Sequence, residues 1–522
     1  MNRRTFFITG AAFAGALAAP RGASASEARQ AVPTVGSPES GYADPTQGPW
    51  RRLFLDATVI EEMQGLTRVF HSAEKRTDNP VIRRDLPWET DPKTFGPYVY
   101  GTVMDEGGRL RLWYQVIADG NHVAYAESTD GITWTKPELG LINFRGSRKN
   151  NLVVSAADRT ATGGSCHNPS VLHCPWASDP ARRFRLYGYD HGTGPRMAVS
   201  PDGLRWRFAS ETEGTPLFPS SDVVNFFRDG IRGRFGATWK SVNRRGRAVG
   251  VAWSEDGDRW TRPIAGPVFV ADDLDPDATQ IYGMPVFPYQ GLYIGLPWIY
   301  HARYIKRGFY SPNALYAAQE GSPRTVDIQL AWSWDLINWS RPPDRRPWIE
   351  LGEAGAFDSG MIYTARAPVV VGDRLHFYYG GFRAPHDEPR AEGGIGLATL
   401  RLDGFCSLHA DEAEGSATSR VERFTAPSLT LNGAVRAGGY IEAELINRRG
   451  RPIPGFNRTV CTRFEADEVR GRLGWPSSKL PDSAVREGVR VRFYLKRADL
   501  YAYLPDGAED IQIGPPPVEP AP

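Results

Sequence analysis

The 522-residue sequence has only four cysteines, Cys166, Cys174, Cys406 and Cys461. No two of them form a C-x-x-C pair, which excludes a zinc ribbon and a thioredoxin-like redox motif. Cys166 and Cys174 bracket one predicted strand, and residues at opposite ends of a strand lie too far apart for a disulfide because each residue adds roughly 3.3 Å. We therefore expect free, buried thiols.

Net charge is also nearly absent, with 62 basic and 60 acidic side chains and a formal charge of +2. Residues 1–25 contribute three arginines and no acid, so the rest of the chain is close to neutral. Binding to nucleic acid or to an anionic membrane normally needs a strong basic excess. The sequence therefore predicts no nucleic-acid partner and a ligand that is neutral or locally recognised.

Long hydrophobic runs are missing as well. The chain begins MNRRTFFITGAAFAGALAAPRGASAS, with Arg3 and Arg4 before a mild Ala/Gly-rich run and a small-x-small cleavage signal at residues 23–25. This resembles a twin-arginine signal peptide over residues 1–25 and predicts a secreted or periplasmic protein. The apolar run is too short and too rich in glycine for a confident membrane span, so we expect no stable membrane anchor, with an uncleaved anchor as the alternative.

Glycine, proline and aromatic residues are abundant, with 55 Gly, 42 Pro and 11% aromatics, which favours a soluble, turn-rich, all-β protein. A Ser-x-Asp-Gly-x-x-Trp motif recurs, in thinned form, about every 50 to 80 residues. Its serines are Ser128, Ser200, Ser254 and Ser333, and its tryptophans are Trp134, Trp206, Trp260 and Trp339. Two or three strand-like runs precede each motif, and this spacing is typical of one propeller blade per repeat.

The repeats predict a five-bladed β-propeller over residues 50–410. A fifth, degenerate unit has Asp403-Gly404 in place of the full motif, and residues 52–71 are the candidate for the strand that closes the ring. Residues 26–49 are expected to be flexible, 411–423 to be a linker, 424–506 to form a β-sandwich and 507–522 to be disordered.

The repeated acids are predicted to shape turns rather than to catalyse. Aspartate can accept backbone hydrogen bonds in a turn, glycine adopts positive φ, and tryptophan covers the space between neighbouring sheets. This structural role is assigned to Asp130, Asp202, Asp256 and Asp335.

The motif, the aromatic second strands and the blade count resemble the five-bladed propeller glycoside hydrolases of families 32 and 43, and the C-terminal segment is similar to the accessory domain of many family 32 enzymes. The resemblance implies a carbohydrate substrate and a funnel-shaped site on the propeller axis, lined by carboxylates from several innermost strands. Glycoside cleavage needs one carboxylic acid that protonates the leaving oxygen and a carboxylate that attacks or activates water.

Acids beside predicted innermost strands, outside the repeated turns, are the catalytic candidates. Asp222 in FPSSDVVNFF comes first and Asp358 in GAFDSGMIYT second, and the others are Glu353, Glu89 and Asp56. For each acid, the alternative is a loop cap or a solvated surface group.

Polar and aromatic residues at the same strand ends are candidates for binding a sugar: Asn225, His167, Asn168, Gln280, Tyr282, Trp88 and His386. No clustered set of metal ligands is present, so no cofactor is expected, with an axial metal ion at His167 and Asn168 as the alternative. Three other functions stay open: a glycan-binding propeller without catalysis, a protein-interaction scaffold, and a polysaccharide lyase.

Overall fold

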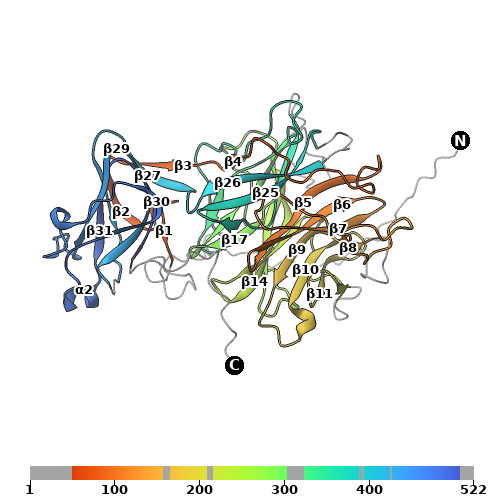
Figure 1. The fold of residues 1–522 in the computed structure, drawn as a ribbon, viewed down its shortest axis with the longest axis horizontal. Coiled ribbons are helices and arrows are strands. Elements are labelled where there is room, and N and C mark those ends of the chain that lie inside the picture. The colour runs from red at the N-terminus through yellow and green to blue at the C-terminus, as the bar shows by residue number, and fades with distance from the viewer. Residues whose placement is uncertain are drawn as a thin grey trace, which may run out of the picture.

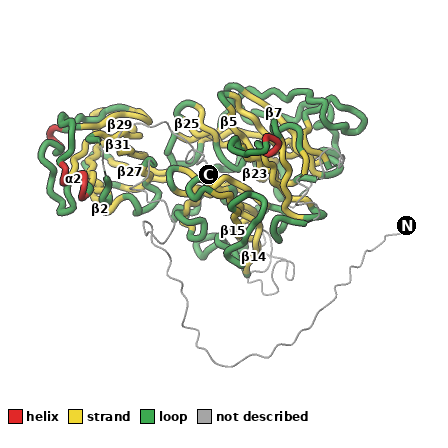
Figure 2. The backbone as a smooth tube through the Cα atoms, turned by 90° about the horizontal axis from the view of Figure 1, so that it is seen from below, coloured by secondary structure: helices red, strands yellow, loops and turns green. Residues whose placement is uncertain are grey.

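The structure is a computed structural model that describes residues 50–156, 165–208, 215–302, 323–386, 388, 393–423 and 426–505. Nearly all regular elements in these ranges are strands, and the described chain forms two lobes, a larger one and a smaller one that contains most of the C-terminal strands (Figures 1 and 2). The larger lobe has a propeller-like arrangement of small antiparallel sheets. No helix in the described ranges is long and apolar enough to cross a membrane.

Four small sheets of the larger lobe follow one another along the chain. The first contains β5 (Phe95–Glu106), β6 (Arg109–Ile117), β7 (Asn121–Ser128) and β8 (Leu152–Ser155). The second contains β9 (His167–His173), β10 (Phe184–Asp190), β11 (Gly194–Ser200) and β12 (Arg207–Phe208). The third contains β13 (Val224–Asp229), β14 (Arg234–Asn243) and β15 (Gly246–Ser254). The fourth contains β17 (Val286–Tyr289), β18 (Leu292–Gly295), β21 (Ala331–Ser333) and β22 (Trp339–Ser340).

An eight-stranded sheet completes the larger lobe, in the order β16-β19-β20-β23-β25-β26-β4, with β24 paired to β25. Its strands are β16 (Thr279–Gly283), β19 (Trp298–His301), β20 (Val326–Ile328), β23 (Met361–Thr364), β24 (Val369–Val371), β25 (Arg374–Phe382), β26 (Gly393–Arg401) and β4 (Glu74–Lys75). Strands β5, β9, β13 and β17 contact one another in turn, and β23 and β25 contact β5, so the lobe closes on itself.

The closing strand differs from the one expected. Strand β4 pairs with β26, Lys75 opposite Ala398, and joins the N-terminal segment to the eight-stranded sheet. Most of residues 52–71, expected to close the ring, instead form β1 (Arg52–Leu53), β2 (Ile60–Gln64) and β3 (Thr67–Phe70) of the smaller lobe. An alternating strand pattern does not specify which of two sheets the strand joins. Here β1 pairs with β31, β2 with β28 and β3 with β27.

The smaller lobe is one eight-stranded sheet around its own apolar core. Besides β1–β3 it contains β27 (Cys406–Ala410), β28 (Gly415–Ser419), β29 (Ser428–Ile446), β30 (Asp467–Gly474) and β31 (Arg490–Pro505), with the short helix α2 (Asp482–Glu487) beside it. Residues 411–423, expected to be a linker, therefore include β28, which pairs with both β2 and β31. The polar composition of the segment concealed this strand.

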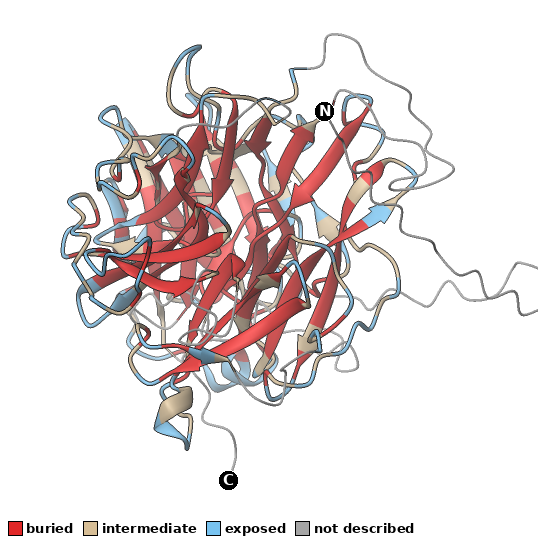
Figure 3. Cartoon of the chain, turned by 90° about the vertical axis from the view of Figure 1, so that its right-hand side faces the viewer, coloured by how far each residue is buried: buried red, intermediate tan, exposed pale blue. Residues whose placement is uncertain are grey.

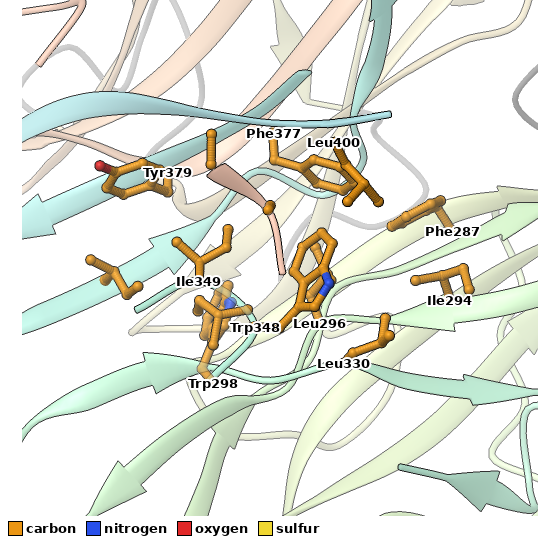
Figure 4. Packing of buried hydrophobic residues seen from close by; sticks show 14 of the residues in the cluster. Phe287, Ile294, Leu296, Trp298, Leu330, Trp348, Ile349, Phe377, Tyr379 and Leu400 are labelled. Carbon is orange, nitrogen blue, oxygen red and sulfur yellow. The ribbon is translucent and has the colours of Figure 1, made fainter. Parts of the chain in front are cut away.

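The main core lies between the fourth sheet and the eight-stranded sheet (Figure 4). Trp298 is fully buried there, and the Trp348 ring meets the Phe377 ring edge-on with centroids 4.8 Å apart. Strands of the larger lobe are buried along most of their length, while the connecting loops are exposed (Figure 3). Because sheets cover both faces of each strand, the strands read as continuous apolar runs in the sequence.

The repeated motif forms the same turn four times. In the first, Asp130 Oδ1 accepts hydrogen bonds from the backbone N–H groups of Ile132 at 2.8 Å and Thr133 at 2.7 Å. These two bonds hold the pKa of Asp130 down at about 2. The Gly131 carbonyl accepts a 2.6 Å hydrogen bond from the Tyr378 hydroxyl of β25, so the turn also ties one sheet to the next.

The other motifs repeat this geometry. Trp113 Nε1 donates to the Gly203 carbonyl at 2.7 Å, and the Tyr187 hydroxyl donates to the Gly257 carbonyl at 2.9 Å. Asp335 accepts from the same two positions of its turn as Asp130 does. The prediction that these aspartates shape the turns is confirmed.

Replacing Asp130 by alanine is expected to lower the free energy of unfolding by about 1 to 2 kcal/mol, because two backbone N–H groups lose their acceptor. Urea denaturation followed by tryptophan fluorescence measures the effect. Glu138→Ala is the control: Glu138 is exposed in the same part of the chain and makes no side-chain hydrogen bond to the described residues. Equal stability of the two variants would contradict the structural role of the motif.

The four cysteines are free, and Cys166, Cys174 and Cys406 are buried while Cys461 is half-buried. The expectation of free thiols is confirmed, and that of burial for three of the four.

Candidate functional site

Aromatic side chains from several strands meet at the centre of the larger lobe. The Tyr100 ring of β5 lies 5.2 Å from the His167 ring of β9, 5.0 Å from Trp298 of β19 and 5.1 Å from Tyr363 of β23. Tyr282 of β16 lies 5.5 Å from Tyr363. We call these five residues the axial cluster. Burial raises the pKa of Tyr100 well above 10.0, so its hydroxyl stays neutral.

Asp222 lies beside the axial cluster, in the loop that leads into β13. Lys240 of β14 donates a short hydrogen bond from Nζ to Asp222 Oδ1, and Lys240 Nζ lies 4.8 Å from the centroid of the Tyr282 ring. The Lys240 side chain is 7% exposed and that of Asp222 34% exposed. Asp222 is therefore held from the buried side while solvent reaches its carboxylate.

The ion pair decides the protonation state of Asp222. Burial acts to raise the pKa of this carboxyl, but the charge and hydrogen bond of Lys240, together with the nearby His167, outweigh it. The pKa of Asp222 lies well below 3.8. An ionised carboxylate at neutral pH suits a nucleophile, a general base or the stabilisation of an oxocarbenium-like charge, and not a general acid.

Replacing Lys240 by methionine is expected to raise the pKa of Asp222, because burial then acts without the opposing cation. Activity that needs ionised Asp222 is present above the pKa of this carboxyl and is lost as the pH falls through it, so the acid limb is expected at a higher pH in the variant than in the natural chain. The pH dependence of kcat/KM on a responsive substrate measures the shift. Lys93→Met, which removes an exposed cation, is the control. An unmoved acid limb would contradict the role of Lys240.

Tyr282 and Gln280 of β16 form the side of the site next to β15 of the third sheet, with His386 against Tyr282. The His386 ring nitrogen Nε2 lies 3.3 Å from the Tyr282 hydroxyl, and its ring lies 4.7 Å from that of Tyr300. Gln280 is 1% exposed, and its Oε1 accepts a 2.9 Å hydrogen bond from Arg247. Gln280 therefore positions Arg247, whose guanidinium lies over the Tyr282 ring, rather than reaching a ligand itself.

Asn168 and Asn225 are both buried and differ in what they contact and in the side that they face. Asn168 is 2% exposed, takes a φ of +59°, and its Oδ1 accepts a 2.9 Å hydrogen bond from the backbone N–H of Val224. Asn168 therefore ties β9 to β13 instead of binding a ligand. Asn225 lies opposite Thr238 in the pairing of β13 with β14, so it faces the same side as Lys240 and stays a candidate for the site.

Asp358 does not join the axial cluster. Asp358 Oδ2 accepts hydrogen bonds from Lys75 at 2.6 Å and from the Tyr379 hydroxyl at 2.8 Å, and the residue is 3% exposed. The Asp358 Cβ lies against Gly381 of β25. Gly380, one residue earlier in β25, lies against Tyr98 and Val99. Because successive residues of a strand face opposite sides, Asp358 lies on the face of β25 away from the axial cluster.

Glu89 is a structural anchor rather than a catalytic residue. It is 0% exposed, and its carboxylate accepts hydrogen bonds from the Tyr114 hydroxyl at 3.0 Å and Lys136 Nζ at 2.7 Å. A carboxylate without solvent contact cannot touch a sugar. Sequence alone could not show that Lys136, far along the chain, encloses it.

The other three nominated residues also lie elsewhere. Glu353 is exposed on a loop. Trp88 packs edge-on against Phe144 at 5.8 Å. Asp56 Oδ2 accepts hydrogen bonds from the indole nitrogens of Trp332 and Trp334, both at 2.9 Å.

Of the residues nominated from the sequence, the structure brings Asp222, His167, Tyr282 and His386 together and leaves Asn225 as a candidate on the same face as Lys240. The sequence interpretation did not include the cation of this site or most of its aromatic residues. The missed residues are Lys240, Tyr100, Trp298, Tyr363, Tyr300 and Arg247. Tyrosines within the innermost strands, as in YVYG and MIYT, were the available signal. Within the described residues, no group of three or more His, Cys, Asp or Glu side chains could hold a metal ion.

No protein-family model matches the chain. Two curated relatives are uncharacterised Mycobacterium tuberculosis proteins from strains CDC 1551 / Oshkosh and H37Rv, each 27% identical over 165 and 164 residues respectively. The matched segment covers 29% of this chain and 47% of each relative, so the chain spans about half the length of the relatives it matches.

Several solved structures that resemble the chain are glycoside hydrolases. A glycosyl hydrolase from Bacteroides ovatus has a TM-score of 0.43 at 15% identity, over 64% of this chain and 94% of its own. A structure from family GH130, which contains mannoside phosphorylases and glycoside hydrolases, has a TM-score of 0.43 at 14% identity, over 64% of this chain and 94% of its own. A Bacillus subtilis family 43 arabinoxylan arabinofuranohydrolase has a TM-score of 0.39 at 12% identity, over 83% of this chain and 99% of its own. At these TM-scores the likeness identifies no activity for this chain.

Proposed function

We propose that the chain is an exported glycoside hydrolase that cleaves a poly- or oligosaccharide, with a furanosidic bond as one candidate, at the axial cluster. One observation carries the proposal: an ionised, solvent-accessible carboxylate, Asp222, lies next to aromatic rings from several strands. Trp298 and Tyr363 are 0% and 1% exposed, so we expect a sugar to contact the half-buried His386 and the edges of Tyr282 and His167 instead. A carboxylate beside them stabilises the positive charge that develops at the sugar carbon. The arginine pair and cleavage signal of residues 1–25 support export to the periplasm or beyond.

In this proposal Asp222 is the carboxylate that attacks the sugar carbon or activates water. Lys240 is a positioning residue that keeps Asp222 ionised and oriented. The complementary proton donor must be a carboxylic acid with a raised pKa, which is a role that Asp222 itself cannot fill. Tyr282 and His386 contact each other, the Lys240 ammonium lies over the Tyr282 ring, and the two residues are the proposed sugar-binding groups.

The finer description of the fold belongs to the same proposal. Strands β23, β25, β26 and β4 lie in that order within the eight-stranded sheet, and β16, β19 and β20 continue β17, β18 and β21 across short breaks. We count the first group as a fifth blade and the second as the inner half of the fourth. The smaller lobe, in which β31 pairs with β27, β28 and β29, is the proposed sandwich.

A screen of the full chain against arabinan, fructan, mannan and arabinoxylan tests the proposal. Release of reducing sugar that requires Asp222 is the expected result. Turnover that is unaffected by Asp222→Asn would contradict it.

A glycan-binding propeller without catalysis is the second candidate. It is favoured by a specific observation: of the five nominated acids, Asp222 alone lies at the axial cluster, and cleavage needs two carboxyl groups. This candidate predicts that a glycan binds, that Tyr282→Ala weakens the binding, and that no bond is cleaved at any pH.

A further inference from the structure

A cleft of about 580 Å³ lies outside the axial cluster, between the segment before β5 and the residues that flank the β25–β26 connection. Arg83, Arg84 and Arg383 line it, together with apolar surface from Phe357 and two prolines. No carboxylate is among the described residues of its lining. The whole chain has a formal charge of only +2, so this grouping of guanidinium groups is local.

The described acids nearest to Arg83 and Arg84 in the sequence accept hydrogen bonds from other cations. Asp78, Asp85 and Asp91 accept hydrogen bonds at 2.6 to 2.7 Å from Arg76, Lys136 and Arg145. The exposed side chains of Arg83 and Arg383 make no hydrogen bond or ion pair to the part of the chain that the structure describes. Two cations of the cleft are therefore available to a ligand.

Arg84 has a different task. Its guanidinium donates short hydrogen bonds to the backbone carbonyls of Glu89 and Asp91. These bonds hold the loop that forms one side of the cleft, so Arg84 adds positive charge from a fixed position.

Phe357 gives the cleft a flat apolar surface. One face of its ring stacks on Tyr379, with centroids 6.1 Å apart. A Cβ at Gly394 would lie 3.0 Å from the Phe357 ring and 3.1 Å from Pro80, so glycine allows both side chains to close over β26. A fixed aromatic ring beside guanidinium groups suits a sugar that carries an anionic group, because the ring packs on C–H groups and arginine binds carboxylate or phosphate oxygens in pairs.

The cleft and the axial cluster share a wall. A Cβ at Gly393, in the cleft lining, would lie 2.9 Å from the Phe382 ring. On its other sides the Phe382 ring lies 6.3 Å from that of Tyr363, in the axial cluster, and 5.1 Å from that of Tyr98. The Phe382 ring therefore lies between the cleft and the axial cluster, so the two places are neighbours in the larger lobe.

We infer that this cleft binds an anionic sugar residue, bearing a carboxylate or a phosphate group, of the glycan that is processed at the axial cluster. The inference rests on the proposed function for the identity of that glycan, whereas the binding itself is measured separately.

Four matched probes test it: glucose, glucuronate, glucose 6-phosphate and inorganic phosphate, each titrated into the full chain and followed by ligand-observed NMR. Glucuronate, glucose 6-phosphate or both are expected to bind at least about tenfold more tightly than glucose, and high salt is expected to weaken that binding. Comparing the affinity for glucuronate with that for glucose 6-phosphate shows whether the cleft prefers a carboxylate or a phosphate group. If inorganic phosphate binds as tightly as glucose 6-phosphate and glucuronate no better than glucose, the cleft is a plain anion site and the inference is overturned.

The double variant Arg83→Ala/Arg383→Ala is expected to lose about tenfold in affinity for the anionic sugar. Its matched control is Arg207→Ala/Arg259→Ala, which removes two exposed arginines elsewhere on the larger lobe. Equal loss in both variants, or equal binding of glucose and its anionic derivatives, would show that no such subsite exists.

Asp222→Asn and Tyr282→Ala separate the two proposals, because both act at the axial cluster and are expected to leave probe binding in the cleft unchanged. If the probes bind through Arg83 and Arg383 but the chain cleaves no glycan, the hydrolase proposal is contradicted and the cleft inference is not. If the chain cleaves neutral and acidic glycans at equal rates, and the double arginine variant does the same, the cleft inference is contradicted and the hydrolase proposal is not.

Discussion

Replacing Asp222 by asparagine is expected to lower the turnover of any glycan that the chain cleaves by about 10³-fold. Asparagine keeps the size of the side chain and can still accept a hydrogen bond from Lys240, but it can neither attack a sugar carbon nor take a proton from water. The Lys240 side chain is 7% exposed and loses its ionised partner, whereas solvent reaches the 34% exposed Asp222 side, so we expect the free energy of unfolding to fall by about 1 to 3 kcal/mol. Initial rates at saturating substrate, with a urea denaturation curve, measure both quantities.

Asp258→Asn is the matched control for this experiment. The Asp258 side chain is 26% exposed and accepts a 2.5 Å hydrogen bond from Arg182, so the substitution removes a similar charge and a similar ion pair in the third motif's turn. Its turnover is expected to stay within about twofold of the natural chain. If Asp222→Asn behaved like Asp258→Asn, the axial cluster would not be a catalytic site.

Replacing Glu89 by alanine is expected to lower the free energy of unfolding by about 3 to 5 kcal/mol. The loss leaves Lys136, whose side chain is 8% exposed, without its buried partner, although the exposed Asp85 still accepts a hydrogen bond from it. The Tyr114 hydroxyl, which is fully buried, loses its acceptor as well. Urea denaturation followed by tryptophan fluorescence measures the change.

A double-mutant cycle with Lys136→Met isolates the pair. Each single variant leaves a buried group uncompensated, so the double variant is expected to lose less than the sum of the two, with a coupling of about 1 to 3 kcal/mol. Glu74→Ala is the control, because the pair of Glu74 with Arg374 is exposed on both sides and is expected to contribute less than about 1 kcal/mol. A loss below about 1 kcal/mol for Glu89→Ala would show that the enclosed carboxylate does not stabilise the fold.

Local patterns predicted the elements of the larger lobe well. A turn of the Ser-Asp-Gly kind depends on a few consecutive residues, so Asp130 and its three counterparts could be assigned before any contact was known. Buried strands in a layered sheet arrangement read as apolar runs, and this gave the strands on either side of each turn. The acid in front of the third innermost strand, Asp222, was found by the same local reasoning.

Contacts across long separations were not predictable in this way. Lys240 reaches Asp222 because β14 returns beside β13. Lys75 reaches Asp358 because β4, more than 300 residues earlier in the chain, pairs with β26. Asp222 and Asp358 look alike in the sequence, each a few residues ahead of an innermost strand. The face of the sheet on which each carboxylate ends distinguishes them, and that face depends on the exact register of the strand.

By itself the sequence determined the β-rich repeats, the turns that end them and the near-neutral charge, because each depends on composition or on residues a few positions apart. Only the tertiary structure decided which acid meets the aromatic centre and that β1–β3 belong to the smaller lobe. It also decided that three arginines line one cleft, with no carboxylate among its described lining residues. Those outcomes depend on which strand edges pair and on which side chains are buried against one another. Such contacts join residues tens to hundreds of positions apart, and no local pattern records them.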